Sequence, residues 1–239
     1  MKKKSKLFLS EKIEEKLKPT LSLLPNTDGI ISLTTANHSE KSNKRVIELL
    51  SSLGNCLKKV NQEYLNSEEF EFILNSCIKG VRENYQKTKL VAFKALLINS
   101  TLDFETTQNE KEYYLELLNS LNELHIKILT LMISPENYLS YYNIDLTSIN
   151  DKYISETNHQ DINFKNLIPE LIPGYNFEII KAAFLELSDL RLIWIKNKVL
   201  EQGNLDTLFT FPNRVKDNGL KFINFISLEN SNIQTAIIK

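Results

Sequence analysis

The sequence is poor in cysteine, histidine and glycine. It contains 2 cysteines, 3 histidines and 6 glycines in 239 residues. Cys56 and Cys77 stand far apart within apolar helical patterns, which argues against a disulfide framework or a structural zinc site and suits a reducing compartment. The glycines form no cluster of the kind that cradles phosphates, so neither a P-loop nor a dinucleotide fingerprint is present. We therefore expect a cytoplasmic protein that needs no cofactor and no metal.

The chain also lacks an excess of charge and a long apolar run. It has 29 lysines and arginines against 30 aspartates and glutamates, which leaves no global positive charge to hold a polyanion. Any nucleic-acid site would have to be a local patch. The nearest approach to a membrane span, "LSLLPNTDGIISL", is interrupted by Pro25 and the turn at 26–29, and it is shorter than the roughly 20 apolar residues that a bilayer requires. The sequence thus predicts no stable membrane insertion.

A helical pattern fills the first half of the chain. Apolar side chains recur at alternating steps of four and three along one narrow seam, which consists of Val46, Leu50, Leu53, Leu57, Val60 and Tyr64. After this seam, Ser67 predicts the N-cap of a second, long helix whose apolar residues run through 70–97. Residues 1–108 are therefore predicted to form an N-terminal helical bundle. A heptad-like seam serves packing within the chain or the pairing of a homodimer, and both interpretations stay open.

The second half of the chain predicts shorter elements. A helix covers 123–132, and the polar stretch 135–165 has so little helical period that it indicates a long insertion. After two more helices, the runs "RLIWIKNKVLE" and "TLFTFP", joined through Gly203 and Asn204, indicate strands, and a last helix follows. This order predicts a mainly α protein whose residues 109–239 form a winged-helix-like module with a small two- or three-stranded antiparallel sheet.

Three stretches carry a resemblance to a group of uncharacterised bacterial all-helical proteins. They are "LSLLPNTDGIISL" before a helix with Lys44 and Arg45, then "FILNSCIKGVRENYQKTKLVAFKALLINSTL" with "YYLELLNSLNELHIKILTLM", and finally "DLRLI" with "NGLKFINFI". The ending is similar to the winged module of the abortive-infection alpha group, whose proteins act in phage defence. This resemblance implies an accessory or regulatory role linked to defence against phage, and it carries over no catalytic residues.

Candidate catalytic and metal-binding residues are few. Glu156, His159 and Asp161 place a histidine within three positions of two carboxylates, and we interpret them as solvated loop residues because a metal site needs ligands from ordered elements. His125, at a helix start, predicts a partly buried, hydrogen-bonded imidazole. The chain contains no nucleophile elbow, so we expect no enzyme. An active site assembled from distant carboxylates would leave no sequence signature, and this alternative stays open.

The predicted groove-facing helix of the module is acidic. Its carboxylates Glu178, Glu186 and Asp189 would repel phosphate, because a recognition helix normally offers cations or amides to DNA. We therefore predict a non-enzymatic adaptor or regulator that acts through protein contacts, since exposed aromatic side chains favour interfaces. The candidate partner contacts are Trp194, Tyr138, Tyr141 and Tyr142. The alternative is a DNA-binding winged-helix regulator that uses a basic wing, with Lys196, Lys198, Arg214 and Lys216 as candidate nucleic-acid contacts. Lysines on such strands also protect a sheet edge from pairing.

Overall fold

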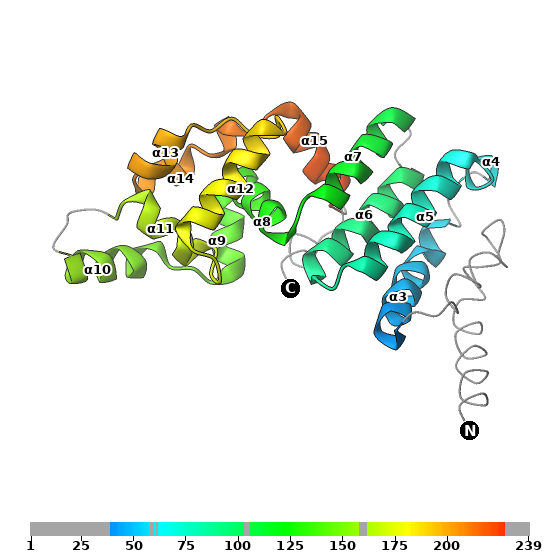
Figure 1. The fold of residues 1–239 in the computed structure, drawn as a ribbon, viewed down its shortest axis with the longest axis horizontal. Coiled ribbons are helices and arrows are strands. Elements are labelled where there is room, and N and C mark those ends of the chain that lie inside the picture. Colours follow the sequence, from blue (N-terminus) through cyan, green and yellow to red (C-terminus); the bar gives the residue numbers. More distant parts are fainter. Residues whose placement is uncertain (1–38, 58–59, 61, 103–105, 158–161, 228–239) are drawn as a thin grey trace, which may run out of the picture. The chain divides into compact units, whose positions relative to one another are not determined.

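The computed structural model describes residues 39–57, 60, 62–102, 106–157 and 162–227 (Figure 1). Every regular element of these residues is a helix. The chain divides into two compact units, and the division falls after Ser120. Unit 1 comprises Met1–Ser120 with Phe225–Asn230, and unit 2 comprises Leu121–Asn224 with Ser231–Lys239.

Unit 1 is built from helices that pack around one apolar core. Their bounds are α3 (Glu40–Leu57), α4 (Gln62–Leu65), α5 (Glu68–Glu83), α6 (Lys87–Leu102) and α7 (Gln108–Ser120). The predicted seam is confirmed over α3, where Val46, Leu50, Leu53 and Leu57 are fully buried. The helix ends at Leu57, so Val60 and Tyr64 lie beyond it. Helix α3 packs against α5 and α6, so the seam is used within the chain.

The predicted long second helix is in fact two helices, α5 and α6. Ser67 caps α5 as predicted, since its Oγ accepts the backbone N–H of Phe70 at 3.2 Å. The helix ends at Asn84, whose extended backbone lets its N–H bond to the carbonyl of Gly80. A Cβ atom at Gly80 would collide with the ring of Phe93, so glycine allows α6 to fold back closely against α5. Such a return depends on a contact between helices, which periodicity does not reveal.

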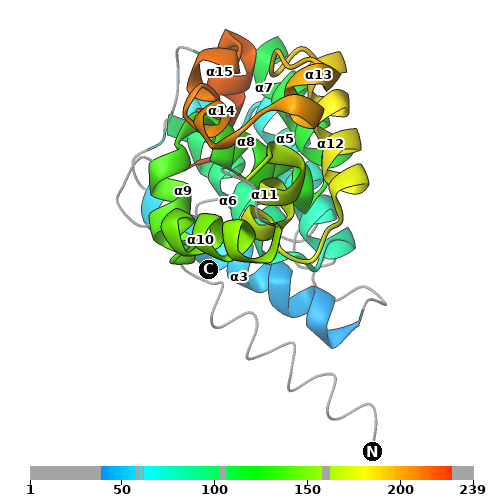
Figure 2. The same ribbon diagram turned by 90° about the vertical axis from the view of Figure 1, so that its left-hand side faces the viewer.

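Unit 2 contains more and shorter helices. Their bounds are α8 (Glu123–Ile133), α9 (Pro135–Tyr142), α10 (Leu146–Thr157), α11 (Phe164–Leu171), α12 (Phe177–Asp189), α13 (Asn197–Gln202), α14 (Leu205–Phe209), the 3-10 helix η1 (Pro212–Arg214) and α15 (Asp217–Phe225). Helix α11 packs against α12, α13 and α14 (Figures 1 and 2). The predicted helix at 123–132 is confirmed as α8. The stretch 135–165, predicted to be an irregular insertion, is largely the helices α9 and α10.

The predicted winged-helix sheet is wrong. Among the described residues there is no β-strand, and the only extended pairings are two isolated antiparallel bridges, Asn163 with Asn204 and Ile193 with Val215. Of the two runs predicted as strands, 197–201 belong to α13 and 207–209 to α14, and the rest forms no strand. Asn204 was interpreted as a turn residue, but its backbone N–H bonds to Thr207 Oγ1 at 3.0 Å and it begins α14. Tertiary packing decides this outcome, because the short helices bury Leu200 and Leu208 in the core.

None of the helices in the described part of the chain combines the length and the apolar character that crossing a bilayer requires.

Candidate interaction surface around Trp194

The segment that follows α12 is fixed by backbone hydrogen bonds. At the end of α12 the N–H of Leu192 reaches back to the carbonyl of Leu187 at 3.0 Å. The chain then runs beside residues 214–216, where Trp194 donates to the carbonyl of Arg214 at 2.7 Å and Lys216 donates to that of Leu192 at 3.0 Å. Leu192 and Ile193 are fully buried and Ile195 is 5% exposed, so the segment is anchored in the core while Trp194 stays half exposed.

Helix α15 holds this segment from the other side. A Cβ atom on Gly219 would collide with the carbonyl oxygen of Leu192, so only glycine lets the first turn of α15 approach so closely. The backbone that carries Trp194 is therefore held between α12 and the start of α15.

The side chain of Trp194 is half exposed, with 51% of its surface accessible. The Nζ atom of Lys196 lies 5.6 Å from the centroid of the indole ring, and the Cζ atom of Arg214 lies at the same distance of 5.6 Å. Both geometries are cation–π contacts. Sequence reasoning assigned Trp194 to a protein interface and the two cations to a nucleic-acid interface, and the fold brings all three residues together.

Positive charge near Trp194 is not neutralised. Among the described residues, no carboxylate forms an ion pair with Lys196, Lys198, Arg214 or Lys216. The Nε atom of Arg214 donates to Thr210 Oγ1 at 3.3 Å. We call Trp194 with Lys196 and Arg214 the Trp194 surface. It combines an aromatic ring with two cations on a chain whose overall charge is close to zero.

The acidic side chains of α12 are largely engaged elsewhere. Glu178 and Glu201 both pair with Lys181, which lies 2.6 Å from the Glu201 carboxylate. Glu186 Oε2 lies 2.8 Å from His125 Nε2, while His125 Nδ1 accepts the backbone N–H of Asn122 at 3.2 Å. The predicted buried, hydrogen-bonded imidazole is thus confirmed, with 4% of His125 exposed. Its partner Glu186 was missed, because the two residues stand 61 positions apart in the sequence.

The candidate tyrosines form a separate cluster. Tyr138 was expected to be exposed, but only 1% of it is accessible and its hydroxyl donates to the carbonyl of Leu171 at 3.1 Å. The ring of Tyr142 lies 4.5 Å from that of Tyr138 and 5.1 Å from that of Tyr141. Burial raises the pKa of Tyr142 to about 12. Tyr138 therefore belongs to the core, while Tyr141 and Tyr142 keep part of their surface exposed and make no described ring contact with Trp194.

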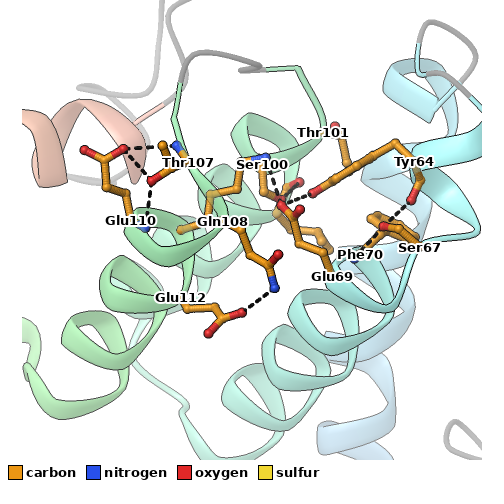
Figure 3. A network of polar contacts seen from close by, with 12 residues as sticks. Tyr64, Ser67, Glu69, Phe70, Ser100, Thr101, Thr107, Gln108, Glu110 and Glu112 are labelled. Atoms are coloured by element: carbon orange, nitrogen blue, oxygen red, sulfur yellow. Dashed lines mark hydrogen bonds and ion pairs between the residues drawn. The ribbon is translucent and has the colours of Figure 1, made fainter.

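A polar network in unit 1 is the alternative candidate for an active site. Glu69 Oε1 accepts a hydrogen bond from the Tyr64 hydroxyl at 3.1 Å (Figure 3). The same oxygen lies 3.0 Å from Lys111 Nζ. The ammonium group of Lys111 also lies 4.9 Å from the Tyr64 ring centroid. Burial, together with the Glu69 carboxylate, raises the pKa of Tyr64, so this phenol is not an activated one.

A hollow of about 380 Å³ lies on the outer side of α5, and its lining residues are Glu68, Glu71, Phe72, Asn75, Ser76 and Lys79. None of them belongs to the network around Glu69. The network thus connects α4, α5 and α7, and the geometry gives it a role in packing.

The remaining candidates offer no reactive group in the described part of the chain. Cys77 is fully buried, and burial raises the pKa of its thiol, so it packs as a small apolar residue. The side chains of Cys56, Glu156, His159 and Asp161 lie outside the described residues. Within the described residues, no group of three or more histidine, cysteine or acidic side chains is arranged to hold a metal ion.

Comparisons with protein-family models, with curated proteins and with solved structures find no match to this chain. The class that the fold defines is therefore the broad one of an all-α protein over the described residues.

Proposed function

We propose that this chain is a non-enzymatic adaptor or regulatory protein whose Trp194 surface binds an acidic segment of a partner protein. The observation that supports it is the half-exposed indole of Trp194 between two cations, on a backbone held in place by α12 and α15. Aromatic and arginine side chains dominate the binding energy of protein interfaces. Cations without an ion pair on the same surface favour a partner that supplies carboxylates. The link to phage defence rests on the resemblance of the C-terminal sequence alone.

The geometry favours a protein over a nucleic acid as the partner. A base that stacks on an indole needs access to its face, and two cationic groups already lie 5.6 Å from the ring centroid of Trp194. Binding of DNA through a wing would need a sheet, and the described residues contain none.

Trp194 reports directly on its own surface, because it is the only tryptophan of the chain. Its fluorescence is measured during titration with poly-L-glutamate and, separately, with single-stranded oligothymidylate of equal charge, both at low salt. We expect a saturable response to poly-L-glutamate at lower concentration than to the oligonucleotide. Replacement of Lys196 and Arg214 together by glutamine is expected to weaken the poly-L-glutamate response about tenfold.

The matched control is Lys44→Gln on α3, whose side chain is 77% exposed and belongs to unit 1. This variant is expected to bind as the unaltered protein does. Absence of any response to poly-L-glutamate would contradict the proposed function. A tighter response to the oligonucleotide would favour the nucleic-acid alternative instead.

A further inference from the structure

Arg191 adopts a backbone conformation that its side chain disfavours. It follows α12 with φ at 59°, in the left-handed region, at the position where helices most often place glycine. The other non-glycine residue with positive φ among the described residues is Asn143, and asparagine tolerates this region. A glycine in place of Arg191 would satisfy the same turn with less backbone strain.

The contacts of the fold explain only in part why an arginine occupies position 191. A cation at the C-terminal end of α12 is attracted by the helix dipole, which offsets some of the strain. Yet in the described part of the chain Arg191 forms no ion pair, although Asp189 stands two positions away. Strained residues that nothing in the fold requires tend to gather at functional sites.

Arg191 stands three positions before Trp194, at the start of the segment that carries the Trp194 surface. Arg191 is exposed, while the next two residues, Leu192 and Ile193, are fully buried. The left-handed turn therefore directs the chain inward directly after Arg191. Residue 191 lies at the edge of the pairing in which Leu192 bonds to Lys216 and Trp194 bonds to Arg214.

We propose that Arg191 is a binding residue of the Trp194 surface and that its guanidinium receives a carboxylate of the acidic partner segment. The inference rests on the proposed function and extends it to a residue outside the original candidates. A guanidinium donates two parallel hydrogen bonds to one carboxylate, which a lysine ammonium does not reproduce. Arginine at a glycine position is then the result of selection for binding at a cost in stability.

Two substitutions at the same position separate binding from folding. Arg191→Gly and Arg191→Ala both remove the guanidinium, so both are expected to weaken poly-L-glutamate binding to the same extent, by about two- to fivefold at low salt. Their effects on stability differ, because glycine relieves the strain at positive φ and alanine retains it. The midpoint of thermal unfolding is expected to be about 2–4 °C higher for Arg191→Gly than for Arg191→Ala.

A third variant and a control complete the experiment. Arg191→Lys keeps the charge and is expected to retain part of the affinity. Asn143→Gly changes the other left-handed residue, at the end of α9, and is expected to leave binding unchanged. If the unaltered protein binds poly-L-glutamate and both Arg191→Gly and Arg191→Ala bind equally well, the role of Arg191 is refuted while the proposed function stands. If the unaltered protein gives no response, the proposed function itself fails.

Discussion

Lys89 is a buried lysine whose charge should make the stability of this protein depend on pH. Only 2% of the residue is exposed, and its Nζ atom donates to the carbonyl of Leu118 at 2.5 Å and to that of Asn119 at 3.4 Å. These carbonyls belong to the last turn of α7, where the helix dipole attracts a cation. Burial nevertheless disfavours the charged form and lowers the pKa of Lys89 to about 8.

The sign of the effect follows from proton binding. Between pH 8 and the ordinary lysine pKa of 10.5, the unfolded chain keeps a proton that the folded protein releases. The free energy of unfolding therefore rises with pH across this window. Below the window Lys89 is protonated in both states and causes no pH dependence. At 1.36 kcal/mol for each pH unit, the full gain is at most about 3 kcal/mol. The neutral amine still donates to the α7 carbonyls, so those hydrogen bonds are retained.

The test compares the unaltered protein with Lys89→Met. Urea unfolding is followed by far-UV circular dichroism at several values between pH 7 and 10.5, and the difference in unfolding free energy is plotted against pH. We expect the unaltered protein to gain about 1–3 kcal/mol relative to Lys89→Met across this range. Lys87→Met, at an exposed position of the same helix, is the control and should show no such trend. A flat difference between the unaltered protein and Lys89→Met would refute the reasoning.

Three further predictions concern the packing of unit 1. Gly80→Ala should destabilise the protein by about 1–3 kcal/mol in thermal unfolding, because the added methyl group meets the Phe93 ring. Adding Phe93→Leu should recover part of this loss, and no recovery would contradict the explanation. Lys111→Met should cost about 1–3 kcal/mol by leaving Glu69 half-buried without its cation. A double-mutant cycle with Glu69→Gln should then give a clear coupling energy, and additive effects would argue against the pair. Arg45→Lys should lower the free energy of unfolding by about 1–2 kcal/mol, since the Arg45 guanidinium donates to two carbonyls at the end of α5 at 2.7 Å each. An unchanged midpoint of chemical unfolding would contradict this prediction.

Local signals in the sequence predicted local structure well. The seam of α3 followed from the spacing of Val46 to Leu57, and the start of α5 followed from Ser67. The buried, hydrogen-bonded state of His125 was predicted from its place at the start of α8. Each of these features depends on residues within a few positions of one another, so a single sequence is enough to reveal it.

The C-terminal region shows where such signals fail. "RLIWIKNKVLE" is rich in residues that favour strands, but only residues around Ile193 are extended and α13 begins at Asn197. A strand needs a partner along its length, and here the pairing with residues 214–216 stops after a single bridge. Propensity could not reveal this, because the partner segment is 22 positions away and its path is set by η1 and Gly219.

The residues of the candidate surface were predicted, but it was not predicted that they lie together. Trp194, Lys196 and Arg214 were each identified, yet as contacts for two different kinds of partner. Arg191 was not identified as special, since its strain becomes visible only through a backbone φ of 59°. Tyr138 was expected at the surface because its neighbours are polar, and only the packing of α9 shows that it is buried.

The sequence by itself determined that this protein is mainly helical, where several of its helices begin, and that its charge is nearly balanced, because composition, periodicity and capping act over a few residues. Tertiary structure alone decided that the tryptophan is joined by two cations, that an arginine occupies a left-handed turn and that the expected sheet does not form. These outcomes depend on contacts between segments far apart in the chain, and such contacts form only when whole helices pack together.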